Sequence, residues 1–206
     1  MKAVERDLPD VDNLVFVGDA IGGGLQPGKC VKWLREHADI AVVGNHDKRA
    51  FEDKEKKLSH ISDYLQPKLE EDDVEWLRGL PKNEEVNGYL VTHSHPENSK
   101  AIIPSENNVN RVFRKFLSYE ENINHLLEDY KGVIYGHTHI PTDLYKEDKH
   151  YLNHGAVGVP RPSQIGLKPS VVTLKPSYAL LDTESQKSRI CRTEYKIVDD
   201  IKNWMP

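Results

Sequence analysis

The segment VIYGHTHIPTDLY, from Val133 to Tyr145, places His137 and His139 between a buried apolar run and a resumed extended chain. Successive side chains of an extended chain point to opposite faces, so these two histidines reach a common ligand only if the backbone turns at them. Turns at the ends of buried strands commonly carry the binding residues of α/β proteins. The segment therefore predicts a β-strand that ends in a ligand-binding turn.

Three other apolar runs also end in side chains that can bind a metal ion. These runs are NLVFVGD (13–19), DIAVVGNHDK (39–48) and YLVTHSHP (89–96), and their polar ends are Asp19, Asn45, His46, Asp47, His93 and His95. Because strands of an open α/β sheet that end alike share one edge, we expect these side chains to lie near His137 and His139. Any one of them alone would be explained as a turn residue, a helix cap or a surface histidine. Their recurrence at four strand ends favours a binding site.

The types of donor atom at these strand ends indicate which ligand they would hold. Carboxylate, amide oxygen and imidazole together suit Mn²⁺, Fe²⁺, Ni²⁺ or Zn²⁺. No cysteine belongs to these motifs, which argues against a structural zinc site. Four further histidines lie in polar helical or turn contexts and receive no role: His37, His60, His125 and His150.

The composition excludes several classes of protein. The chain has 206 residues, of which 37% are hydrophobic and 30% are charged, and its net charge is −5. This balance argues against nonspecific binding to nucleic acid, and no apolar run approaches the ~20 residues of a membrane span. The two distant cysteines and the polar start predict a protein of the reducing cytoplasm.

The patterns between the motifs predict one α/β domain over residues 1–206. The pair Asn87-Gly88 is the strongest short signal for a β-hairpin. Alternating residues in 142–155 and 177–197 predict antiparallel strands. Apolar spacing predicts helices over the ranges 29–38, 70–81, 108–117 and 119–130.

The motifs GD, GNHD, a histidine after a strand, GHTHIP and NHGAVGVPR follow one another in this order. In this order the chain resembles the calcineurin-like metallophosphoesterases, and most of all their small single-domain phosphodiesterase branch, from about Ala3 to Lys196. The resemblance implies a layered α-β-β-α sandwich of two mixed sheets flanked by helices. It also implies hydrolysis of small phosphate-ester or nucleotide-like substrates at a site with two divalent metal ions.

The resemblance also implies a role for each matching residue. Asp19 would bridge the two metal ions. Asn45, His93 and His137 would be the remaining ligands of the second ion, and His139 would bind the first. His46 would stabilise the developing charge on the phosphate or protonate the leaving alkoxide, and Asp47 would orient His46 by a hydrogen bond. Asn45 and His46 would also contact the substrate. Arg161 would pair with the substrate phosphate, with a surface salt bridge as the equal alternative.

The chain departs from the family pattern at its start. The family begins with a strand that ends in Asp-x-His and binds the first metal, whereas KAVERDLPDVD (2–12) resembles the helix that follows that strand. We therefore expect an N-terminally truncated domain whose first metal keeps only Asp19 and His139. The triplet Asp148-Lys149-His150 is read as a coincidence at a hairpin tip.

Three readings of the activity remain open at this point. In the first, which we favour, the sequence starts at an internal methionine, and the full protein is a phosphoesterase that carries the missing strand and two metal ions. In the second, the chain is complete, holds one metal ion and hydrolyses esters weakly or not at all. In the third, it is a catalytically weak or inactive metal-binding scaffold that mediates protein interactions. A sheet edge left unpaired by a missing strand would suit a homo-oligomer.

Overall fold

The computed structural model describes residues 1–22, 26–51, 69–97, 101–102, 119–120, 123–158 and 176–194. Its helices are α1 (Lys2–Asp7), α2 (Pro27–His37) and α3 (Glu71–Gly79), with short 3-10 turns η1 (Asp47–Ala50) and η3 (Asn124–Leu126). Its strands are β1 (Val15–Phe16), β2 (Ile40–Ala41), β3 (Asn83–Val86), β4 (Tyr89–Thr92), β5 (Ala101–Ile102), β6 (Tyr119–Glu120), β7 (Gly132–Tyr135), β8 (Thr142–Lys146), β9 (Lys149–Asn153), β10 (Ser177–Asp182) and β11 (Lys187–Arg192). None of the helices within these ranges is long and apolar enough to span a lipid bilayer.

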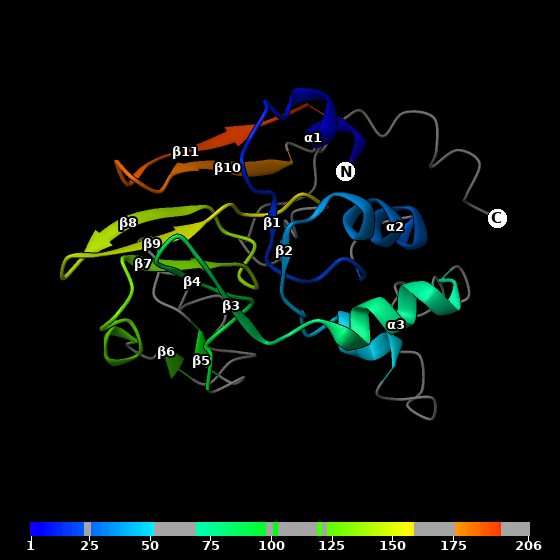
Figure 1. The fold of residues 1–206 in the computed structure, drawn as a ribbon, viewed down its shortest axis with the longest axis horizontal. Helices are drawn as coiled ribbons and strands as arrows, with labels where there is room; N and C mark the ends of the chain where they lie inside the picture. Colours follow the sequence, from blue (N-terminus) through cyan, green and yellow to red (C-terminus); the bar gives the residue numbers. More distant parts are fainter. Residues whose placement is uncertain are drawn as a thin grey trace, which may run out of the picture.

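A five-stranded mixed sheet forms the centre of the fold, with the strand order β3-β4-β7-β9-β8 (Figure 1). Strands β4, β7 and β9 are parallel, and the antiparallel strands β3 and β8 form the two edges. The parallel register aligns Thr92 with Tyr135 and Tyr135 with Asn153, so three strands end at the same side of the sheet. The predicted α/β class with a mixed sheet is confirmed.

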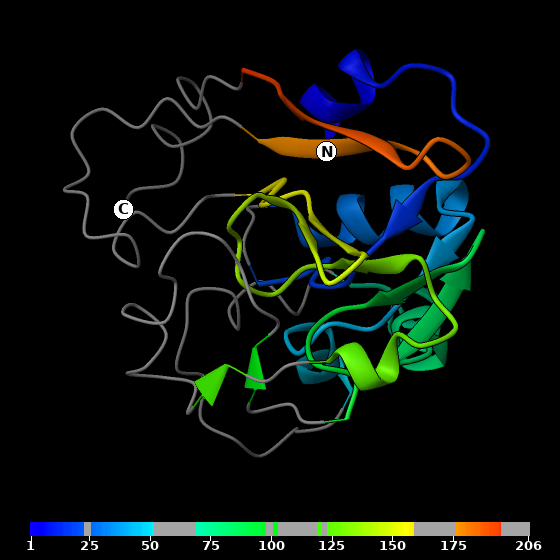
Figure 2. The same ribbon diagram turned by 90° about the vertical axis from the view of Figure 1, so that its left-hand side faces the viewer.

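The remaining described strands form three separate pairs. Strands β1 and β2 are parallel, β10 and β11 are antiparallel, and β5 pairs with β6. We expected two mixed sheets, whereas the part of the chain that the structure describes has one five-stranded sheet and these pairs. Helix α1 lies on the β10–β11 hairpin (Figures 1 and 2), where the hydroxyl of Tyr178 donates to the backbone oxygen of Asp7.

The core consists of layers on both faces of the central sheet. Because side chains alternate along a strand, Tyr89 and Val91 of β4 face the β1–β2 pair, where they pack with Val17 and Val42. On the opposite face of the sheet, a second cluster contains Leu90, Ile123, Leu127, Val133, Tyr135 and Tyr151. Helices α2 and α3 lie side by side (Figure 1) and form a third cluster through Val31, Leu77 and Ile21. The layers hold the strand ends in fixed positions.

The turn predictions agree with the structure more closely than the helix predictions. Asn87 and Gly88, with φ of 48° and 84°, join β3 to β4 as the predicted hairpin. The helices predicted over 29–38 and 70–81 correspond to α2 and α3, and the one over 108–117 lies outside the described residues. The helix predicted over 119–130 is wrong, because strand β6 and the turn η3 lie there. The spacing of Ile123 and Leu127 suits a single turn that buries both side chains on the sheet.

His150 lies in the interior rather than in the polar turn context expected from the sequence. Its ring is fully buried, with Nδ1 3.1 Å from the hydroxyl of Tyr89 and Nε2 2.9 Å from a carboxylate oxygen of Asp143. The ring of Tyr145 stacks on it at 4.3 Å. In the sheet register His150 pairs with Gly132, at the opposite end of the parallel strands from Asn153. The triplet 148–150 is therefore remote from the strand ends that carry the other motifs.

Candidate metal centre

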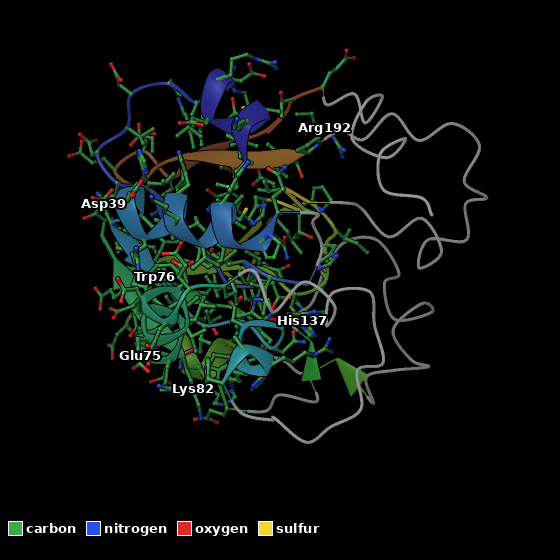
Figure 3. The ribbon with its side chains drawn as sticks, turned by 90° about the vertical axis from the view of Figure 1, so that its right-hand side faces the viewer. Asp39, Glu75, Trp76, Lys82, His137 and Arg192 are labelled. Carbon is green, nitrogen blue, oxygen red and sulfur yellow. The ribbon has the colours of Figure 1, made fainter. Side chains whose placement is uncertain are left out.

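The carboxyl ends of β1, β4 and β7 are joined directly to one another. His93 follows β4, and its Nδ1 lies 2.7 Å from the backbone oxygen of Val17 at the end of β1. The backbone N–H of Gly136, after β7, donates to the backbone oxygen of His93 over 3.1 Å. Figure 3 shows His137 on the side of the molecule opposite Asp39, the residue before β2. The site therefore lies where the parallel strands end.

Four donor atoms from four different loops converge at this place. The amide oxygen Oδ1 of Asn45 lies 3.0 Å from Nε2 of His93 and 2.9 Å from Nδ1 of His137. The two ring nitrogens are 3.3 Å apart. Oδ2 of Asp19 lies 3.3 Å from the same Nε2 of His93. The structure thus brings together Asp19, Asn45, His93 and His137, as the sequence predicted.

The orientation of His93 leaves an electron pair directed into this cluster. Its Nδ1 faces a backbone carbonyl, which can only accept a hydrogen bond, so Nδ1 carries the proton of the neutral ring. Nε2 is then an acceptor that faces the oxygens of Asn45 and Asp19. Acceptors directed at one another repel unless a proton or a cation lies between them. A hydrogen bond from the far ring nitrogen to a backbone carbonyl is also the usual support of a metal-binding histidine.

The spacing of the four atoms fits a metal ion. Donor atoms about 2.0–2.2 Å from a common ion are themselves separated by roughly 3.0–3.5 Å, and the observed separations run from 2.9 to 3.3 Å. Among the described residues, no group of three or more His, Cys, Asp and Glu side chains is by itself arranged to hold a metal. The arrangement therefore depends on the amide oxygen of Asn45 as well as on the histidines and Asp19.

The charges in the cluster move the pKa values of its members apart. Burial alone would raise the pKa of Asp19, but His93 and His46 outweigh it and hold that pKa below its ordinary value. Burial also opposes the charged form of His93, but the Asp19 carboxylate raises the pKa of His93 above its usual range. Burial and repulsion from His93 lower the pKa of His137 to about 4. The cluster accordingly favours one positive charge next to Asp19.

Strained backbone is concentrated at the same residues. Asp19, His137 and His139 have φ of 64°, 65° and 61°. This left-handed region costs about 1–2 kcal/mol for a residue with a Cβ. Such strain persists only where surrounding contacts hold it, and it commonly marks functional sites. The other non-glycine residues with positive φ in the described ranges lie at or beside hairpin turns: Asn87, Glu147, Asp148 and Gln186.

Asp47 braces the loops that carry two of the four donors. One of its carboxylate oxygens accepts the backbone N–H groups of Asp19 and Gly44 over 2.8 and 2.9 Å, and the other accepts that of Ile21 over 3.2 Å. Burial and the charge of Asp19 raise the pKa of Asp47 to about 6, against the lowering effect of these N–H groups. The orienting hydrogen bond that the carboxylate of Asp47 would accept from the His46 ring stays a prediction.

His46 lies beside the cluster rather than within it. Its backbone N–H donates to Oδ1 of Asp19 over 2.8 Å. A Cβ placed on Gly22 would lie 2.2 Å from Nδ1 of the His46 ring, so only glycine leaves room for this ring. The charge of His46 also contributes to the lowered pKa of Asp19. The imidazole is thus near the four donor atoms without being one of them.

The remaining predicted site residues differ in how much the structure shows of them. His139 follows His137 in the same turn, and its charge helps to lower the pKa of His137. His95 is buried, with Nδ1 accepting the backbone N–H of Glu97 over 3.2 Å. Arg161 lies outside the described residues. Sequence reasoning assigned no role to Asn153, although this residue opens the run NHGAVGVPR and contacts the GHTH turn.

Comparisons with known proteins identify the family of this chain and proteins with a similar fold. The model of a family described as "Calcineurin-like phosphoesterase superfamily domain" matches residues 1–186. A relative from Methanocaldococcus jannaschii, "Uncharacterized protein MJ0912", is 28% identical over 232 residues, covering 96% of this chain and 84% of the relative.

Two solved structures have a similar fold. The metallophosphoesterase from Sphaerobacter thermophilus has a TM-score of 0.75 at 24% identity, over 100% of this chain and 89% of its own. The hypothetical protein PH1004 from Pyrococcus horikoshii OT3 has a TM-score of 0.66 at 17% identity, over 98% of this chain and 84% of its own.

Replacing Gly44 by alanine tests how closely the loops approach one another. The new Cβ would lie 2.2 Å from Oδ1 and 2.3 Å from the backbone nitrogen of Asp19, so Gly44→Ala must displace Asp19. We expect the free energy of unfolding, measured by urea titration, to fall by about 1–3 kcal/mol. Gly79→Ala is the matched control, because a Cβ there meets nothing within 4 Å. Equal unfolding midpoints for the two variants would contradict the close approach.

Proposed function

The chain belongs to the calcineurin-like phosphoesterase superfamily, whose members hydrolyse phosphoric esters, and from this premise we propose that it holds a divalent metal ion with Asp19, Asn45, His93 and His137. The observation that carries the proposal is that Nε2 of His93 lies 3.0–3.3 Å from the facing atoms of Asn45, His137 and Asp19, while Asn45 and His137 approach each other to 2.9 Å. When bound, such an ion polarises the phosphoryl oxygens and activates water as a nucleophile. Mn²⁺, Fe²⁺, Ni²⁺ and Zn²⁺ all suit this mixture of oxygen and nitrogen donors.

The residues of the chain provide orientation and charge at this site. Asp19 supplies the negative charge, since it is the only carboxylate among the four donors. Asn45 adds a neutral oxygen and would also contact the substrate. Nδ1 of His93 is held by the backbone oxygen of Val17, which keeps Nε2 directed at the other donors. The substrate class is a small phosphate ester or a nucleotide-like molecule.

His46 is the proposed catalytic residue. Its backbone N–H is bound to the carboxylate of Asp19, so the position of His46 is tied to the metal-binding group. A protonated imidazole at this place stabilises negative charge that develops on the phosphate, or gives its proton to the leaving alkoxide oxygen. Asp47 supports this role by holding the loops of Asp19 and Gly44 together. The role of His46 and the hydrogen bond by which Asp47 would orient its ring both stay proposals.

A second metal ion is part of the proposal. Oδ2 of Asp19 is directed toward His93, whereas Oδ1 accepts the backbone N–H of His46, so the two carboxylate oxygens face different groups. His139 follows in the same turn as His137 and supplies another imidazole. Asp19 and His139 would hold this ion, the first metal of the family pattern, and with two protein ligands it would bind more weakly than the ion held by four.

Binding of metal to the purified, metal-free protein tests the proposed ligands. We expect His137→Ala to weaken the binding of Mn²⁺, measured by calorimetry, by at least about 100-fold, because one of four donors is lost and metal sites respond strongly even to outer-shell changes. His125→Ala is the matched control, because His125 is exposed on the remote turn η3. Equal affinities for His137→Ala and the wild type would refute the assignment of ligands.

The variant His46→Ala separates an enzyme from a scaffold of the same fold. With Mn²⁺ and bis-p-nitrophenyl phosphate, we expect kcat to fall about 10²–10⁴-fold, the usual contribution of a general acid or base. The affinity for Mn²⁺ should stay within about twofold of the wild type, because His46 is not a ligand. An unchanged kcat would contradict the catalytic role. A wild-type chain that binds Mn²⁺ but leaves the ester intact would favour the inactive scaffold.

A further inference from the structure

Asn153 makes three hydrogen bonds from a fully buried side chain at the end of β9. Its amide nitrogen donates to the backbone oxygen of Gly136 over 2.8 Å and contacts Oγ1 of Thr138 at 3.1 Å. Its amide oxygen accepts the backbone N–H of Gly155 over 2.8 Å. The exposed fraction of Asn153 is 0%. One side chain therefore links β9 to the turn after β7 and to the loop that follows.

The turn that Asn153 holds is the strained one. Gly136 and Thr138 are the immediate neighbours of His137, and Thr138 also precedes His139. Both histidines have left-handed backbone, and the N–H of Thr138 folds back onto the oxygen of Gly136 over 2.7 Å. Two such residues in one short turn store about 2–4 kcal/mol relative to ordinary backbone. A turn of this kind needs contacts from outside to stay in a single conformation.

We propose that Asn153 is a positioning residue for the candidate metal centre, acting through the GHTH turn. By holding Gly136 and Thr138, it keeps Nδ1 of His137 2.9 Å from the amide oxygen of Asn45. The inference rests on the proposed function, because its consequence is measured at the metal. Asn153 does not touch the four donor atoms in the contacts described above, so its effect is indirect.

The chemistry of the contacts explains why this position requires an amide. The two partners on the turn need a donor, and the N–H of Gly155 needs an acceptor. Aspartate has the same shape but no donor when ionised, and it would direct a negative charge at the carbonyl of Gly136. Gly155 itself has no room for a side chain, because a Cβ there would lie 2.5 Å from Oγ of Ser177. The amide oxygen of Asn153 thus faces the backbone of Gly155 where it is tightly packed.

The proposal predicts separate effects on the metal and on the histidine rings. In Asn153→Asp we expect Mn²⁺ affinity to fall about 10–100-fold, the usual loss when an outer-shell partner of a metal ligand is changed. In the metal-free protein, the side-chain ¹H–¹⁵N NMR signals of His137 and His139 should shift while those of His150 stay in place. Asn83→Asp is the matched control, because Asn83 is exposed on the edge strand β3. It should change neither measurement.

The outcomes distinguish a positioning role from a merely structural one. A lower melting temperature with unchanged Mn²⁺ affinity and unchanged His137 signals would overturn the inference and leave the proposed function intact. A wild-type chain without Mn²⁺ affinity would overturn the proposed function, and the NMR signals of the metal-free protein would still decide the role of Asn153. If Asn153→Asp fails to fold, Thr138→Val is the second variant, because it removes the hydrogen bond between Asn153 and Oγ1 of Thr138. Thr138→Val should shift the NMR signals of His137 and His139, and unchanged signals would overturn the inference.

Discussion

The site depends on one electrostatic constraint. Nε2 of His93 lies 3.0–3.3 Å from Oδ1 of Asn45, Nδ1 of His137 and Oδ2 of Asp19, and Oδ1 of Asn45 lies 2.9 Å from Nδ1 of His137. The oxygens of Asp19 and Asn45 and the facing nitrogens of His93 and His137 repel one another wherever neither a proton nor a cation lies between them. The Asp19 carboxylate favours positive charge at this place, because it raises the pKa of the His93 ring against the effect of burial. In the proposed site a divalent cation would offset the repulsion better than a proton, because it would bind all four atoms at once. Metal binding is thus favoured by the arrangement of the donors.

The rest of the fold supplies the forces that hold these donors together. Parallel strands bring their carboxyl ends to one side of the sheet, and the packed layers keep them there. Asp47 then connects the loops after β1 and β2 through three backbone N–H groups, and Asn153 connects the turn after β7 to β9. The left-handed backbone of Asp19 and His137 is the cost of directing their side chains inward. Two buried polar side chains offset that cost.

The sequence predicted the features that are encoded locally and missed those that depend on distant partners. The two residues Asn87-Gly88 are enough to predict their hairpin. Polar residues after each apolar run predict that these runs end at one edge of a parallel sheet. The apolar spacing in 119–130 led to a wrong helix prediction, because a single 3-10 turn buries Ile123 and Leu127 as a helix would. The burial of His150 depends on Tyr89 and Asp143, which the sequence alone does not bring near it. The contacts of Asn153 likewise cross 15 and 17 positions of the chain.

Anomalous X-ray scattering from a crystal of the chain grown with Mn²⁺ tests the central claim most directly. The account predicts a peak about 2.0–2.3 Å from a carboxylate oxygen of Asp19, Oδ1 of Asn45, Nε2 of His93 and Nδ1 of His137. A protein crystal saturated with Mn²⁺ that shows no peak among these four atoms, or shows their side chains turned away from one another, would contradict it.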